Sequence, residues 1–350
     1  SSLFAAVWEP YAGEPFITDV RLEGDVADAT GFAAVHVQTR AGHRDVVFSD
    51  AVAPQPRTLA DGVLIDGSFA YVSRDGAGLR QVCLVGGREL RLPELGVKPS
   101  LRAHEAEVVS LDYLNNTATL DHALPAALAG RFLEVGTEAK DGRGARWSNF
   151  QVVASGSAEA GGRGLVKWRK GADGGTGLID GIRPMGEVMS DANQARHWTT
   201  RGATKDDVLL QLRMETGMPE GRDRQVALGK SVGGEKVSAD VFGEAIVIKA
   251  ADAARLALAP ADRVRLYEIA VGDTFRAATQ VALVREEGKV YRIDTDTPCT
   301  VSVRASAAWS STDGGQTWQE LPSAADAPEQ REWSISAEQA AAGALRLRWE

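Results

Sequence analysis

Residues 68–85 read SFAYVSRDGAGLRQVCLV, and this stretch decides the fold class. Two runs rich in β-branched and aromatic residues, 68–74 and 79–85, flank the segment Asp75-Gly76-Ala77-Gly78. Asp-Gly between such runs is a strong hairpin signal, because glycine accepts a positive φ without a Cβ clash. The stretch therefore predicts an antiparallel β-hairpin.

The same pattern of short runs and turn residues continues along the chain. Turn signals recur at spacings of about 10 residues, which is typical of a β-sandwich. The sequence predicts an all-β fold of antiparallel β-sandwich domains with few short helices, the latter at 252–258 and 336–342. The predicted strands outside the first hairpin are 3–8, 16–22, 35–38, 45–48, 63–67, 108–113, 117–120, 132–135, 147–153, 208–214, 241–249, 264–271, 279–284, 290–293 and 301–304.

A chain of 350 residues is longer than a single ordinary core, so more than one domain is expected. Residues 154–164 are mostly glycine, serine and alanine, which is typical of a linker or of a long surface loop. We predict a β-sandwich over residues 1–155, a second β-rich domain or a continuation of the sandwich over 156–278, and a small β domain over 279–350.

Charge and hydropathy limit the partners. The formal net charge of −9 argues against nucleic acid, whose phosphates need a dense basic surface. No apolar run reaches the roughly 20 residues needed to span a bilayer, so we expect no membrane partner. The two cysteines, Cys83 and Cys299, are either buried free thiols or one long-range disulfide. Periplasmic, secreted and cytoplasmic bacterial locations all stay open.

Residues 311–318, STDGGQTW, match the Asp-box pattern Ser-x-Asp-x-Gly-x-Thr-Trp of sialidases. An aspartate in this position can accept hydrogen bonds from turn amides, and the glycines permit a tight reversal. The pattern predicts a hairpin that serves the fold rather than catalysis. Trp309 and Trp318, like Trp8 and Trp147, are expected to anchor a β-sandwich core.

The strongest candidate for a ligand contact is the segment 193–198, NQARHW, in a stretch without clear periodicity. Arg196, His197 and Trp198 bring together a cation, an imidazole and an aromatic face, which suits contacts with a carbohydrate. Ordinary loop packing is the alternative. The other histidines lack metal-ligand spacing, so we predict no metal site, no cofactor and no catalytic residue.

Several phrases resemble the C-terminal β-sandwich region of heparinase II/III-like polysaccharide lyases. They are residues 3–11 (LFAAVWEPY), 15–17, 108–113 and 124–131, so that the similarity lies mainly within residues 1–150. The resemblance implies a β-sandwich that packs on an upstream helical catalytic domain and contacts an acidic polysaccharide or oligosaccharide. It also implies that the parent protein cleaves uronic-acid polymers by β-elimination.

The chain opens within a predicted strand, 3–8, which leads us to expect a piece of a longer protein. The favoured hypothesis is the non-catalytic β-sandwich portion of such a lyase. One alternative is a self-contained glycan lyase that uses His197 with Tyr267 or Tyr291 in acid–base roles. A secreted β-rich interaction module is the other alternative.

Overall fold

The computed structural model divides the chain into two compact units, residues 1–104 with 278–350 and residues 105–277. The residues it describes are 7, 9, 13–24, 31–50, 54–112, 115–138, 145–158, 162–169, 173–216, 224–230, 236–242, 245–267, 269, 271–324 and 327–350. Most of the lyase-like phrase at residues 3–11 lies outside this part of the chain.

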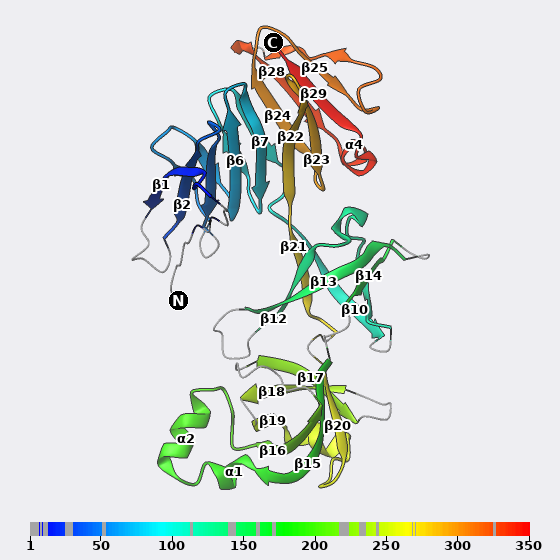
Figure 1. Cartoon of the computed structure of the whole chain (residues 1–350). Helices are drawn as coiled ribbons and strands as arrows, with labels where there is room; N and C mark the ends of the chain where they lie inside the picture. The colour runs from blue at the N-terminus through cyan, green and yellow to red at the C-terminus, as the bar shows by residue number, and fades with distance from the viewer. Residues whose placement is uncertain are drawn as a thin grey trace. The chain divides into compact units, whose positions relative to one another are not determined.

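The first unit is an antiparallel β-sandwich of two sheets (Figure 1). One sheet has ten strands, in the spatial order β1 (Ile17–Gly24), β2 (Ala33–Thr39), β3 (Arg44–Ser49), β6 (Phe69–Asp75), β7 (Gly78–Val85), β22 (Gln280–Glu287), β23 (Val290–Thr295), β29 (Leu345–Trp349), β25 (Ala308–Ser311) and β26 (Gln319–Glu320). The other sheet has seven strands, in the order β27 (Ser323–Ala324), β28 (Ala327–Ile335), β24 (Cys299–Arg304), β9 (Leu95–Pro99), β8 (Glu89–Arg91), β5 (Leu64–Asp66) and β4 (Arg57–Thr58).

One hydrophobic core joins these two sheets. Phe48 and Leu84 of the ten-stranded sheet belong to the same buried cluster as Leu90 and Val301 of the seven-stranded sheet. Alternate residues of each strand point inward, as the two-residue period of a strand requires. The prediction of an all-β fold built from stacked antiparallel sheets is confirmed.

The predicted hairpin at 68–85 is present as β6 and β7. Asp75 pairs with Gly78 across the turn, and its side chain accepts a hydrogen bond from the amide of Ala77 at 2.8 Å. Gly78 has φ +106°, a conformation that glycine adopts without a Cβ clash. Local turn chemistry therefore sets the register at the centre of the large sheet.

The second unit contains two closed six-stranded barrels. The first comprises β10 (Ala103–Asp112), β11 (Thr117–Leu120), β14 (Gly164–Trp168), β13 (Ala145–Ser157), β12 (Phe132–Glu138) and β21 (Thr274–Ala278). The second comprises β15 (Asp173–Pro184), β16 (Asp207–Thr216), β19 (Ala245–Lys249), β18 (Lys236–Phe242), β17 (Arg224–Lys230) and β20 (Arg263–Tyr267). Each barrel has a buried core of its own, and closure leaves no open strand edge.

The bounds of the two units differ from the predicted segments 1–155, 156–278 and 279–350. Residues 154–157 belong to β13, which pairs with β14 through Ser157 and Gly164. The small-residue stretch thus connects two paired strands of one barrel instead of joining two domains. The sandwich resumes at residue 278, because β22 pairs with β7, Gln280 opposite Val85, and so continues the sheet that the chain left after β7.

The helices are few and short: η1 (Ala126–Leu128), α1 (Met185–Val188), α2 (Ala192–Thr199), α3 (Ala250–Arg255) and α4 (Ala337–Ala342). The helix that was predicted from Ser336 is α4, and a capping box between Ser336 and Gln339 starts it. Among the described residues, no helix combines the length and apolar character needed to cross a membrane.

Both cysteines are buried, Cys83 on β7 and Cys299 on β24, and no disulfide joins them. The open question of a disulfide is thereby answered. Burial raises the pKa of the Cys299 thiol to about 11, so this side chain is a poor nucleophile near neutral pH.

Candidate functional site

The predicted carbohydrate contact, Arg196, His197 and Trp198, lies on helix α2 and not in a loop. The side chain of Asp191 caps this helix, because it accepts hydrogen bonds from the amides of Asn193 at 2.9 Å and Gln194 at 3.1 Å. Consecutive helical residues point about 100° apart, so the three side chains do not share one face. The prediction of an aperiodic loop here is wrong, and the N-cap Asp191 is the sequence signal that could have revealed the helix.

Trp198 is only 8% exposed and belongs to a small core with Met185 and Val247. Its ring meets Phe242 edge-on at 5.7 Å and His197 edge-on at 5.3 Å. The ring is therefore a packing element, as the alternative interpretation of this segment had it, and it offers no open face for a sugar. Arg196 and His197 are exposed.

The tyrosines of the acid–base alternative also occupy buried positions. Tyr291 is 3% exposed, its hydroxyl donates to the carbonyl of Leu79 at 2.7 Å, and burial raises its pKa. Tyr267 is 6% exposed, with Lys236 and Arg265 over its ring at 5.4 and 5.7 Å. None of the contacts found within the described ranges joins either hydroxyl to His197.

Four histidines contact single polar partners. His36 lies 3.0 Å from Glu23, His43 3.1 Å from Arg80, and His122 2.9 Å from Asp121. His104 lies 3.7 Å from Asp296. A search of the described residues for three or more His, Cys, Asp or Glu side chains around one point found no metal site.

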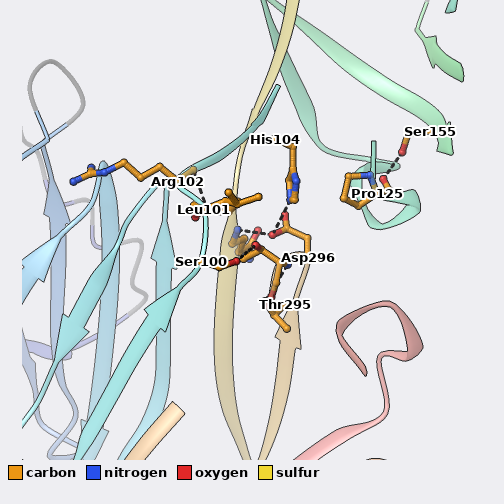
Figure 2. A network of polar contacts seen from close by, with 11 residues as sticks. Ser100, Leu101, Arg102, His104, Pro125, Ser155, Thr295 and Asp296 are labelled. Carbon is orange, nitrogen blue, oxygen red and sulfur yellow. Dashed lines mark hydrogen bonds and ion pairs between the residues drawn. The ribbon is translucent and has the colours of Figure 1, made fainter. Parts of the chain in front are cut away.

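A buried polar network of the sandwich surrounds Asp296, on the turn between β23 and β24 (Figure 2). Its carboxylate accepts a hydrogen bond from the amide of Gln280 at 2.9 Å, and His104 points toward it. The hydroxyl of Thr279 lies 2.7 Å from the carbonyl of Leu101 and 3.0 Å from that of Arg102. Most of these partners are backbone groups at residues 101–104 and 279–280. The network therefore stabilises the two segments at which the chain passes out of the sandwich and returns to it.

The predicted Asp-box turn is present between β25 and β26. The carboxylate of Asp313 accepts hydrogen bonds from the Thr317 amide at 2.9 Å, the Thr317 hydroxyl at 2.6 Å and the Ser311 hydroxyl at 2.7 Å. These donors hold the pKa of Asp313 far below its usual range. All of these donors lie within residues 311–317, so the contacts stabilise the turn itself.

The outward side of the ten-stranded sheet carries an unusual surface on β1, β2, β3 and β6. Cross-strand pairing aligns Leu22 with Val35, Val35 with Val47, and Val47 with Tyr71. The opposite side of the same strands holds core residues such as Phe48. We call the outward set the outer apolar face; its members are Val20, Leu22, Val35, Val37, Val47, Phe69 and Tyr71.

Four members of the outer apolar face remain substantially open. Val20 and Leu22 are each 47% exposed, Phe69 37% and Val47 36%. An antiparallel sheet that covers a core with one side usually presents polar residues on the other. An exposed group of apolar side chains of this kind marks a site of interaction with another surface.

Comparisons with known proteins give no family for this chain. No protein-family model, no curated protein and no solved structure matches it.

Proposed function

We propose that this chain is the non-catalytic β-rich portion of a bacterial polysaccharide lyase resembling heparinase II/III, and that its outer apolar face packs on a helical catalytic domain. The observation that carries the proposal is the outer apolar face itself, on four adjacent strands of the sandwich. The resemblance of the sequence to the C-terminal region of these lyases supplies the identity of the partner.

A helical domain suits this surface physically. A helix presents an apolar stripe, and such stripes pack well on the apolar side of a sheet. Full burial of one Val, Leu or Phe side chain contributes about 2 kcal/mol, so covering the remaining exposed fraction of four side chains contributes on the order of 3 kcal/mol. Contacts at the rim of such an interface would add to this value.

Cysteine labelling tests the contact directly, because both native cysteines are buried. The Val47→Cys variant would be made in this chain and in the protein encoded by its native gene, and the rate of maleimide labelling compared. We expect labelling in the native gene product to slow by about tenfold or more, because covering a surface site suppresses reagent access in proportion to the closed population. Thr312→Cys, on the exposed Asp-box turn, is the matched control and should react equally in both proteins.

Three outcomes would overturn the proposal. The first is a native gene that encodes no helical domain, and the second is an equal labelling rate of Val47→Cys in both proteins. Protection in the isolated chain that rises with its concentration would instead assign the outer apolar face to a second copy.

An activity assay tests the non-catalytic character. Eliminative cleavage of a uronic-acid polymer creates an unsaturated uronate that absorbs in the ultraviolet. We expect no increase in absorbance with the isolated chain, and sustained turnover by it would refute the assignment.

A further inference from the structure

We propose that Arg348, Trp309 and Trp318 form a binding subsite for a uronic-acid sugar on the outward side of the ten-stranded sheet. This subsite is distinct from the outer apolar face, which lies on β1, β2, β3 and β6. The inference rests on the proposed function in one respect: that function is why we choose a uronic acid among the sugars whose ring carries a carboxylate.

Strand pairing places two members of the subsite side by side. Trp309 on β25 is directly opposite Arg348 on β29. The neighbours of Arg348 along its strand, Leu347 and Trp349, are buried in the sandwich core, so Arg348 points to the outward side. The prediction that Trp309 and Trp318 anchor the core is wrong, because both rings are half-buried on this outer side.

The guanidinium of Arg348 contacts both indole rings. Its Cζ atom is 4.7 Å from the ring centroid of Trp309 and 4.6 Å from that of Trp318. Both distances are within the range of a cation–π contact, which holds the guanidinium over the rings. The subsite is therefore preorganised before any ligand arrives.

The Asp-box turn is what brings Trp318 to this position. Gly314 and Gly315 adopt φ of +76° and +93°, and the Asp313 carboxylate ties both ends of the turn together. A Cβ atom added at Gly315 would lie 3.5 Å from the Trp318 ring. The motif thus has a consequence beyond the hairpin, since it delivers an aromatic ring onto the sheet beside Arg348.

The charge of Arg348 has no carboxylate partner in the described part of the chain, unlike the other arginines of this surface. Arg346 pairs with Glu286 at 2.6 Å, and Arg292 pairs with Asp294 at 2.9 Å. The contacts of Arg348 within the described residues are the two rings, and its buried Nε makes no hydrogen bond there. Because the Nε atom is buried, an external carboxylate would accept from the terminal N–H groups of this guanidinium, which make no hydrogen bond within the described residues either.

The combination of groups selects the ligand class. A guanidinium recognises a planar carboxylate through paired N–H donors, while indole rings pack on the apolar C–H surface of a ring and tolerate polar surroundings. A uronic acid carries both features in one residue. The overall negative charge of the protein disfavours densely sulfated polymers and leaves sugars with a single carboxylate as the better fit.

Calorimetric titration of this chain with tetrasaccharides of galacturonate, of mannuronate and of alternating glucuronate and N-acetylglucosamine tests the inference. We expect at least one to bind with Kd below about 1 mM, and its carboxyl-reduced form to bind about 10–100-fold more weakly, the loss that a charge-assisted hydrogen bond represents. Arg348→Gln should weaken binding by a similar factor. Arg292→Gln is the matched control, and it should change Kd by less than about twofold because that arginine already has a partner.

Any of four results would overturn the inference: none of the three tetrasaccharides binds, the carboxyl-reduced form binds equally well, Arg292→Gln weakens binding as much as Arg348→Gln, or inorganic sulfate competes as strongly as the sugar. Arg348→Lys keeps the charge but loses the planar fork, and it stands in if Arg348→Gln fails to fold; we expect a weaker ligand complex with an unchanged circular dichroism spectrum. The labelling of Val47→Cys should be unaffected in every case, so failure here is distinct from failure of the proposed domain contact.

Discussion

Replacing Tyr291 by phenylalanine removes one hydroxyl from the sandwich core and separates a structural role from a catalytic one. The hydroxyl donates to the carbonyl of Leu79 at 2.7 Å, which ties β23 to the start of β7. Without it, that buried carbonyl loses its partner, at a cost of about 1–2 kcal/mol. The ring of Tyr291 stacks on Trp349 at 4.3 Å, and phenylalanine preserves this contact.

Urea unfolding followed by tryptophan fluorescence measures the effect. Because the chain forms two compact units, the unfolding curve would be fitted with two transitions. For a slope of about 2–3 kcal/mol per molar urea, we expect the sandwich transition to move down by about 0.5 M. Tyr291→Leu also removes the stacked ring and should add about 0.5–1.5 kcal/mol to the loss.

An unchanged urea midpoint for Tyr291→Phe would contradict the structural role of the hydroxyl. The same role would be contradicted if Tyr291→Phe kept its stability but lost a lyase activity that the wild-type chain displays. That second result would revive the acid–base alternative.

Three further predictions concern single sites. Ser336→Ala should destabilise the end of the sandwich by about 1 kcal/mol through loss of the N-cap of α4, as a urea midpoint would record. Cys299 should resist iodoacetamide at pH 8 in the native protein, because its pKa is raised to about 11, and react once urea unfolds the chain; rapid native labelling would contradict this. The pKa of Asp313 is lowered by folding, so its stabilisation of the turn is complete above the ordinary aspartate range near pH 4 and is lost as pH falls through the depressed value. Trp318 fluorescence should therefore be the same at pH 7 and pH 5, whereas Asp313→Asn should loosen the turn at both pH values, with increased cleavage by chymotrypsin at Trp318.

The parts of the fold that could be predicted from the sequence are those that depend on neighbouring residues. Asp75-Gly76-Ala77-Gly78 and the Asp-box each specify a turn through their own glycines and carboxylates, so both could be predicted without knowledge of distant residues. The capping box at Ser336 is equally local. Barrel closure could not be predicted, because it depends on pairing between strands far apart, such as β12 with β21.

The candidate surfaces were harder to predict for a related reason. Alternation along 16–22 separates Val20 and Leu22 from Asp19 and Arg21, but it does not reveal which side meets the core. In the sandwich, the apolar side of β1 points outward, and only the register with Val35 makes this visible. Arg348 likewise gave no signal in the sequence, since its stacking with Trp309 and Trp318 depends on the order of β29, β25 and β26 in the sheet.

Hydroxyl-radical footprinting of Leu22 and Phe69 tests the central claim most directly, because it needs no substitution. The side chains are 47% and 37% exposed in this chain and should be oxidised readily. In the product of the native gene, we predict that their oxidation falls several-fold while that of Trp318 is unchanged. Equal oxidation of Leu22 and Phe69 in the two proteins would contradict the assignment of the outer apolar face as a domain contact.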